Sequence, residues 1–210
     1  MKYLFTKEFL LVFAILILGI LVRSIYFTEN LNFSSDQASF ATESFEIWQN
    51  HELRLIGPSI SFKTLGREVF QGSITYYFQL LFLLPASFEP IGASYLFMIF
   101  CMVMIIPLYV GARLLIHNKA AFLIIAAYAF LPMYVDYTRF LWNPNFQLSL
   151  LPILILLMGL YHESRKTIYL FCLFLWSGIL LLFHYQFVVI IVGLGVYYFF
   201  VKKVGSKNVM

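Results

Sequence analysis

The feature that most constrains this chain is a series of apolar runs, each nearly free of charge and separated from the next by polar residues. The runs cover residues 9–27, 91–112, 120–135, 146–161, 168–183 and 187–201. Charged residues make up only 11% of the chain, against about a quarter in an ordinary soluble domain. A soluble domain of this size could not bury so much apolar surface, so the runs predict helices that cross a lipid bilayer.

The only long polar stretch, residues 28–90, holds seven of the ten acids. Ser34, with Gln37 three residues later, has the pattern of a helix capping box. In the helix that would follow, Asp36, Glu43 and other polar residues share one face. The opposite face is apolar and carries Ala38, Ala41, Phe45 and Trp48. This pattern predicts an amphipathic helix that lies along the membrane surface.

The rest of the polar stretch contains a loop and a second helix. Residues 51–66 include Gly57-Pro58 and predict a loop. Phe70, Ile74 and Tyr77 then begin a helical spacing that continues to Pro85. Its length allows residues 70–85 either to cross the bilayer or to lie at its surface.

The distribution of charge decides between these two arrangements. If residues 70–85 lie flat, both chain ends and the turns at 113–119 and 165–166 share one side, which then holds nine of the fourteen Lys and Arg residues. Basic residues mark the cytoplasmic side. We therefore predict an all-α integral membrane protein of about six transmembrane helices, forming a single domain over residues 1–210. Both termini would be cytoplasmic, in a plasma or inner membrane, and the loop 28–90 with its juxtamembrane helices would be outside.

Several other classes of protein are disfavoured by the sequence. The formal charge of +4 is spread over small groups between apolar runs, with no basic stripe that would indicate nucleic-acid binding. Cys101 and Cys172 fall inside apolar runs and give no disulfide framework. The chain has no glycine-rich phosphate loop, hydrolase elbow or zinc-binding helix motif.

Three polar clusters converge on the outer side in this topology, at residues 34–37, 136–145 and 184–186. Carboxylates there could act as a base or an orienting group, cations could hold a phosphate, and amides and aromatic rings could bind a sugar. The candidate site residues are Asp36, Gln37, Arg67, Tyr76, Asp136, Arg139, Trp142, Asn143, Asn145, His184, Tyr185 and Gln186. We predict no protein metal site and no certain cofactor, while use of a divalent cation stays open.

Each candidate also has a plainer interpretation. The plainer interpretation of Asp36, near a helix start, is a favourable interaction with the helix dipole alone. Asp136 and Arg139 could be a surface ion pair. Trp142, Tyr185 and Tyr76 could be interfacial anchors, and His184 a buried or interfacial histidine. Arg23, near the end of the first run, is expected to snorkel or to pair with a loop acid.

The order of short motifs resembles a known family of membrane enzymes. Leu55-Ile56-Gly57-Pro58 after Asp36 is similar to a first outer loop, and Phe70-Gln71-Gly72 before Tyr76-Tyr77 to the surface helix that closes it. The segment from Tyr137 to Asn145 resembles the second outer loop, and His184-Tyr185-Gln186 a later motif. Together they resemble the C-type glycosyltransferase superfamily, in the family 39-like branch of protein O-mannosyltransferases and the lipid A aminoarabinose transferase.

The resemblance implies a sugar donor on a polyprenyl phosphate, with inverting transfer to a protein or glycolipid acceptor on the outer face. It implies Asp36 as general base, Asp136 as the residue that orders the acceptor or a cation, and Arg139 as partner of the departing phosphate. The pocket would be lined by Asn143, Asn145, His184 and Gln186.

The chain departs from the family pattern in three ways. Gln37 stands where the family commonly has Glu, and Gln71 and Ser73 stand where it commonly has His and Pro. Relatives also continue with further spans, so the resemblance implies an amino-terminal portion of a transferase. Two alternatives stay open: a non-catalytic or partner subunit of a membrane glycosylation complex, and a transporter for a lipid-linked sugar. The apolar runs hold little of the charge that a transport pathway usually contains.

Overall fold

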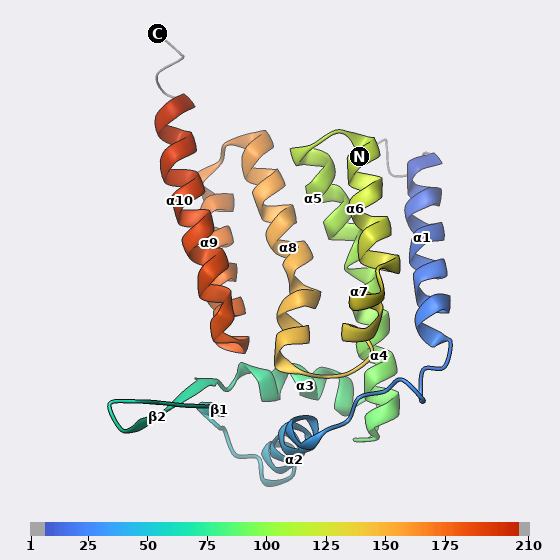
Figure 1. Ribbon diagram of the computed structural model, residues 1–210, viewed down its shortest axis with the longest axis vertical. Helices are drawn as coiled ribbons and strands as arrows, with labels where there is room; N and C mark the ends of the chain where they lie inside the picture. Colours follow the sequence, from blue (N-terminus) through green and yellow to red (C-terminus); the bar gives the residue numbers. More distant parts are fainter. Residues whose placement is uncertain (1–6, 206–210) are drawn as a thin grey trace.

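The computed structural model describes residues 7–205 and consists mainly of upright helices that stand side by side (Figure 1). The upright helices are α1 (Lys7–Ser24), α4 (Pro90–Val103), α5 (Ile105–Leu115), α6 (Asn118–Phe130), α7 (Pro132–Tyr137), α8 (Asn143–Ser164), α9 (Thr167–Phe183) and α10 (Val188–Gly205). Every predicted apolar run falls on one or two of them. Two stretches, Pro90–Leu115 and Asn143–Ser164, are long and apolar enough to cross a membrane by themselves. The number of six spans stays a prediction.

A proline breaks the helix in one of these runs but not in another. Leu131 is extended (φ −64°, ψ 129°) and Pro132 opens a new helix, so residues 120–135 form two helices, α6 and α7, instead of one. The residue before a proline is pushed out of the helical region, which explains the break. Pro152 lies inside α8, which continues through it.

Two further helices, α2 (Ser35–Asn50) and α3 (Ile74–Leu83), lie across one end of the bundle (Figure 1). The capping box of α2 is present, and the backbone N–H of Ser34 donates to Oε1 of Gln37 at 3.0 Å. Helix α2 buries one face against α3. Phe40 and Ile47 pack against α3, whereas Phe45 and Trp48 are half exposed. Contact with α3 therefore determines which face of α2 is buried. The residue pattern of α2 alone does not predict this contact.

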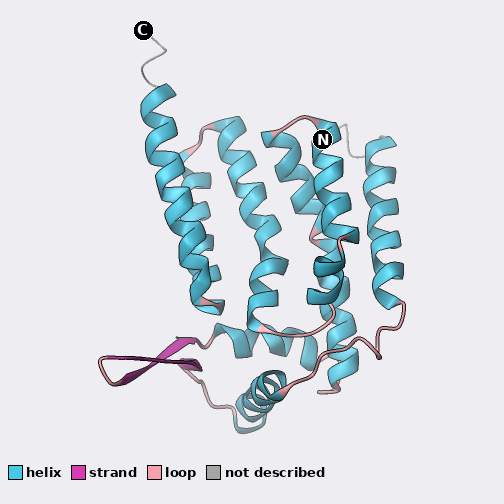
Figure 2. Cartoon of the chain, viewed as in Figure 1, coloured by secondary structure: helices cyan, strands magenta, loops and turns pink. Residues whose placement is uncertain are grey.

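A β-hairpin replaces the expected loop and corrects the all-α prediction (Figure 2). Strands β1 (Ile56–Thr64) and β2 (Arg67–Gly72) pair in antiparallel fashion, with Lys63 opposite Glu68. Polar and apolar residues alternate over 59–62 in the sequence, which is the period of a strand. The Gly57-Pro58 pair, which suggested a loop, lies within β1.

A cluster of aromatic rings attaches α3 to the bundle. The ring of Phe78 lies 5.0 Å from that of Phe146 on α8 and 5.3 Å from that of Phe183 on α9, both edge to face. Edge-to-face pairs at these centroid distances contribute about 0.5–1.5 kcal/mol each beyond the burial of their area. These contacts place α3 directly beneath the ends of α8 and α9.

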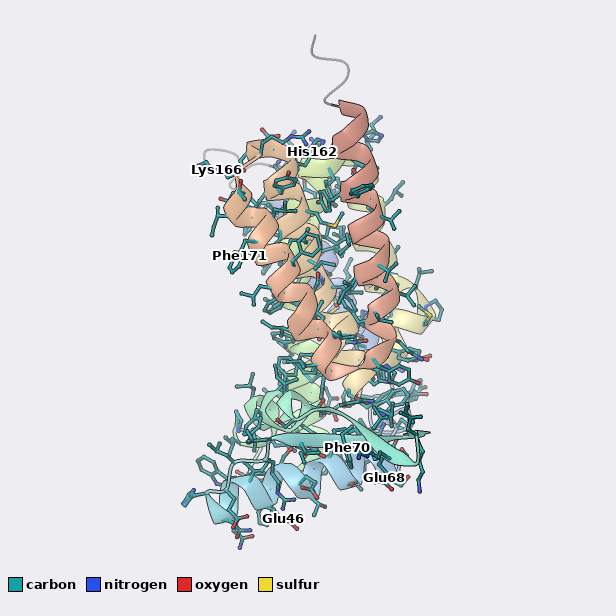
Figure 3. All side chains as sticks on the ribbon, turned by 90° about the vertical axis from the view of Figure 1, so that its left-hand side faces the viewer. Glu46, Glu68, Phe70, His162, Lys166 and Phe171 are labelled. Carbon is teal, nitrogen blue, oxygen red and sulfur yellow. The ribbon has the colours of Figure 1, made fainter. Side chains whose placement is uncertain are left out.

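The opposite end of the bundle is basic and has its own polar network. Arg113 in the last turn of α5 pairs with Glu8 of α1 at 2.8 Å, and Asn118 donates to the same carboxylate at 2.9 Å. His162 and Lys166 lie at this end, far from Glu46 and Glu68 at the other (Figure 3). Lys2 and Lys207, which contributed to the predicted topology, lie outside the described residues.

The closest helix contact is between α5 and α8, and it depends on glycine. A Cβ atom on Gly111 would lie 2.5 Å from the backbone nitrogen of Leu156, and one on Gly159 would lie 2.7 Å from the carbonyl oxygen of Gly111. Small residues allow such an approach between membrane helices.

We expect Gly111→Ala to lower the thermal unfolding midpoint in detergent, because overpacking costs about 1–3 kcal/mol. Gly178→Ala is the matched control, since a Cβ at Gly178 meets nothing within 4 Å. That variant should keep or raise the midpoint, because alanine is favoured over glycine in a helix by about 0.5–1 kcal/mol. Equal midpoints for the two variants would contradict the close packing of α5 and α8.

Candidate functional site

Most of the predicted site residues gather at the end of the bundle that α2, α3 and the hairpin cover (Figure 1). The end of α7, the start of α8 and the turn between α9 and α10 all lie there. Most of the candidates belong to three groups, which draw on α2, the segment from α7 to the start of α8, and the turn after α9.

The first group is centred on Arg23, which is fully buried at the end of α1. Its Nε donates to Oγ1 of Thr138 at 2.7 Å, and its Nη2 donates to the carbonyl oxygen of Tyr128 at 3.0 Å. Nη1 donates to the carbonyl oxygen of Ala129 at 2.5 Å. A continuing helix would satisfy the Tyr128 carbonyl from residue 132, but Pro132 has no N–H. Arg23 therefore caps the broken end of α6 instead of snorkelling or pairing with a loop acid.

Arg139 provides the reciprocal contact, from the segment after α7 to the end of α1. Its Nε donates to the carbonyl oxygen of Arg23 and its Nη2 to that of Ile25, both at 3.2 Å. The remaining nitrogen, Nη1, lies 3.4 Å from Oδ1 of Asp136. The Arg139 side chain is 8% exposed and that of Asp136 is 67% exposed. Arg139 thus ties the end of α7, which carries Asp136, to the end of α1, while the Asp136 carboxylate is exposed.

The second group lies where α8 begins and α9 ends. Asn143 donates through Nδ2 to Oε1 of Gln71 at the end of β2, and to the carbonyl oxygen of Phe183 at 3.3 Å. Gln147, one turn further along α8, donates to the carbonyl oxygens of Leu180 at 2.8 Å and His184 at 2.5 Å. These amides satisfy the last carbonyls of α9, which have no partner inside their own helix.

His184 sits in the turn that follows, with its neighbours exposed. Its ring stacks on that of Tyr185 at a centroid distance of 4.6 Å, and its Nδ1 accepts the backbone N–H of Gln186 at 3.4 Å. Partial burial lowers the pKa of His184 from its usual range. The ring is thus favoured in the neutral form, in which Nδ1 can accept. Tyr185 and Gln186 are exposed beside it.

Three buried polar atoms near this end of the molecule have no hydrogen-bond partner among the described residues. They are Oδ1 of Asn145, Oγ1 of Thr75 and Oε1 of Gln79. Asn145 is 1% exposed and donates through Nδ2 to the carbonyl oxygen of Phe140 at 3.1 Å. Thr75 and Gln79 are one turn apart on α3. Unpaired buried oxygens of this kind are uncommon in folded proteins and mark positions where water or a ligand hydroxyl would be stabilised.

The third group is on α2, where the two adjacent candidates differ in burial. Asp36 is exposed in the first turn, and among the described residues no hydrogen bond or ion pair involves its carboxylate. Gln37 is 3% exposed and is used by the capping box. The Asp36 carboxylate is therefore available to a ligand, whereas Gln37 has a structural task.

The remaining candidates lie apart from these groups or serve as packing residues. Arg67 is exposed at the far end of the hairpin, away from the α8 and α9 ends (Figure 1). Tyr76 is 6% exposed and packs on Phe40 of α2 at a centroid distance of 6.2 Å. Trp142 packs against the same cluster. The structure does not bring Arg67 together with the other candidates.

Two hollows run along one side of α8 and meet there. The first, about 340 Å³, is almost entirely apolar and lies between α6 and α8. The second, about 210 Å³, is lined by Tyr137, Gln147 and Gln186 among other residues and opens near the outer end. Leu148 and Leu151 line both hollows. The two together form one groove along α8 (the α8 groove), with an inner part that is almost entirely apolar and an outer part whose mainly apolar lining includes the amides of Gln147 and Gln186.

Sequence reasoning missed several residues that shape this site. Arg23, Gln71, Gln147 and the pair on α3 were not among the candidates. A charged or amide residue inside an otherwise apolar run is a usable signal, because such a group requires a partner. Gln79 and Gln147 carry that signal in the sequence. Among the described residues, no group of three or more His, Cys, Asp or Glu residues could hold a metal ion.

Comparison with known proteins identifies the family. The family model described as dolichyl-phosphate-mannose-protein mannosyltransferase matches residues 72–209, which is well over half of the chain. No curated protein and no solved structure matches the chain. The fold, with its apolar helices and polar end, together with this match, defines a membrane glycosyltransferase class. The chain belongs to the dolichyl-phosphate-mannose-protein mannosyltransferase family, within the C-type superfamily.

The region matched by the family model contains some of the candidate residues and excludes others. It includes the segments 136–145 and 184–186, together with Gln147 and the whole α8 groove. It begins after α2 and after nearly all of the hairpin, so Asp36, Gln37 and Arg67 lie outside it. Their roles rest on the sequence pattern and on the structure alone.

Replacing Arg23 by Met should strongly destabilise the protein. Met has a similar length but leaves two carbonyl oxygens and the Thr138 hydroxyl without a donor, and each unpaired buried group costs about 1–3 kcal/mol. The unfolding midpoint in detergent should fall by several degrees. Lys119→Met is the control, because Lys119 is an exposed cation at the other end of the bundle. A midpoint for Arg23→Met equal to that of the control would show that the capping contacts contribute nothing.

Proposed function

We propose that this chain takes part in transferring a sugar from a polyprenyl phosphate to a protein or glycolipid acceptor on the outer face of the membrane. The α8 groove is the observation that supports this proposal best. A polyprenyl-phosphate sugar has a long apolar chain and a polar head, and the groove has an almost entirely apolar inner part between α6 and α8 and an outer part where the amides of Gln147 and Gln186 join the lining. Leu148 and Leu151, shared by the two parts, would mark the passage from chain to head.

The proposed chemistry is a single displacement with inversion at the anomeric carbon. The acceptor hydroxyl oxygen forms a bond to that carbon while the bond from the carbon to the phosphate oxygen breaks. The phosphate departs with the electron pair, and Asp36 takes the proton of the hydroxyl. A phosphate ester is already a good leaving group, so orientation of the reactants and stabilisation of charge supply most of the catalysis.

The other candidates have roles that follow from their surroundings. Asp136 is exposed and would order the acceptor or a cation that accompanies the phosphate. Arg139 would face the departing phosphate through Nη1, the one nitrogen that is held only by the 3.4 Å contact to Asp136. Gln186, which lines the outer part of the groove, and its exposed neighbour Tyr185 would contact the sugar.

The first test is the Asp36→Asn variant in membranes supplied with a labelled polyprenyl-phosphate sugar. Asn cannot accept the proton, so we expect transfer to fall by about 10²-fold or more, in the range typical of general-base catalysis. Because Asp36 is exposed and unbonded, the amount of folded protein should be unchanged. Glu29→Gln, which removes another exposed carboxylate of the same outer loop, should leave transfer unaffected.

The results of this test distinguish the proposed transferase from a partner subunit and from a transporter. Transfer at the wild-type rate by Asp36→Asn would remove the proposed base. Wild-type protein that binds the donor without transferring sugar would favour the partner-subunit alternative. Movement of the labelled lipid across reconstituted vesicles, with no transfer, would favour a transporter.

A second test concerns the groove. Leu148→Trp would fill the passage between the two hollows, so we expect a raised KM for a long-chain donor with a smaller change for a donor with a short prenyl chain. Leu123→Trp is the matched control, because Leu123 is 71% exposed on α6 and does not line the groove. An equal change for both chain lengths would argue against the groove as the site of the prenyl chain.

A further inference from the structure

The β-hairpin is fixed at its base against the outer end of α9. A Cβ atom on Gly72 would lie 2.8 Å from Cβ of Leu182, so the end of β2 touches the last turn of that helix. Just before β1, the hydroxyl of Tyr77 donates to the carbonyl oxygen of Arg54 at 2.9 Å and accepts its backbone N–H at 2.8 Å. The base of the hairpin is therefore level with the ends of the upright helices.

From this base the hairpin projects sideways beyond the bundle. Figure 1 shows it lying crosswise to α9 and α10 and extending past them, and Figure 3 shows it crossing the molecule beneath their ends. Five residue steps separate Gly72 from Arg67, which corresponds to about 17 Å for an extended strand. The tip thus lies outside the footprint of the described helices, at the level of their outer ends.

The residue at the tip is unusual for its position. Leu65 and Gly66 have φ values of 52° and 76°, and two successive positive values define the tight turn that favours Asn-Gly. Leucine is disfavoured in this left-handed conformation. Leu65 is also 97% exposed, so it gains no contact within the molecule that would offset the strain. An exposed, strained apolar residue suggests a partner outside the described chain.

The surroundings of Leu65 indicate the chemistry of that partner. Lys63 and Arg67 flank the turn and are exposed, and one acid, Glu68, lies opposite Lys63. Ile56 and Phe70 add exposed apolar surface nearer the base, at 63% and 47%. An apolar tip between cations is the pattern by which protein segments enter the boundary between lipid tails and phosphate head groups.

We propose that the tip of the hairpin docks into the lipid surface of the leaflet at this end of the bundle. Leu65 enters the boundary between head groups and tails, and the ammonium of Lys63 and the guanidinium of Arg67 contact lipid phosphates. The docked tip would fix the hairpin, and through Gly72 and Tyr77 also α9 and α3, relative to the membrane plane. This inference goes beyond the transfer reaction and does not depend on it.

The test uses the full chain in nanodiscs that contain anionic lipid. A Thr64→Cys variant carries an environment-sensitive fluorophore beside the tip, in a Cys172→Ser background, since Cys101 is buried. We expect quenching by lipids with a nitroxide near the head group and little quenching by aqueous iodide. A label on Asn50→Cys, exposed at the end of α2, should show the opposite pattern.

Two turn variants isolate the contribution of Leu65 without unfolding the hairpin. Leu65→Asn suits the left-handed turn but removes the apolar side chain, so nitroxide quenching at position 64 should fall by most of its value. Gly66→Asn also suits the turn and keeps Leu65, so quenching should stay unchanged.

Three results would overturn the proposal. A label at position 64 as open to iodide as the one at position 50 would place the tip in water. A label shielded from both quenchers would indicate a protein partner or a second copy on the hairpin. Undiminished nitroxide quenching in Leu65→Asn would show that Leu65 is not the anchor.

Discussion

Reciprocal capping by two arginines is the constraint on which the candidate site depends. Arg23 of α1 supplies donors to the carbonyl oxygens left free where Pro132 interrupts α6, and Arg139 supplies donors to the carbonyl oxygens at the end of α1. In an apolar environment an unpaired carbonyl is costly, so neither helix end could stay there alone. The two side chains together join α1, α6 and the segment after α7 into one unit.

This unit explains how two distant parts of the sequence come to lie at one end of the molecule. The chain leaves α1 next to Arg139 and then enters the loop that carries Asp36, while Asp136 is held by Arg139 itself. The amides of Asn143 and Gln147 cap α9 in the same way and fix the turn at His184. The candidate segments 136–145 and 184–186 are therefore held by side chains that satisfy backbone groups at helix ends. The Asp36 carboxylate has no hydrogen bond or ion pair among the described residues, because Gln37 completes the capping box beside it.

Features that depend on composition, hydrophobic periodicity and short motifs could be predicted from the sequence. The apolar runs correspond to helices, the capping box at Ser34 begins α2, and the family expected from short motifs agrees with the family match. Features that depend on contacts between distant residues could not be predicted from the sequence. Which face of α2 is buried depends on Tyr76 and Leu80 of α3, and the partners of Arg23 depend on a helix break about a hundred residues away. The Gly57-Pro58 pair predicts a loop, but residues 59–62 alternate between polar and apolar side chains and form a strand that includes this pair.

The α8 groove and the hairpin tip are proposed to contact lipid in two different ways. The α8 groove offers an apolar path along α8 that ends at the amides of Gln147 and Gln186, which suits one lipid molecule that must be held while its head group reacts. The hairpin tip presents a single leucine between two cations at the outside, which suits the bulk lipid surface. A transferase that draws its donor from the membrane needs its reacting groups at a fixed height above the lipid phosphates, because the sugar of a bound donor can reach only as far as its phosphate allows. Since β2 rests on the last turn of α9, an anchored hairpin would set that height for the turn at His184 and, through Gln71 and Asn143, for the start of α8.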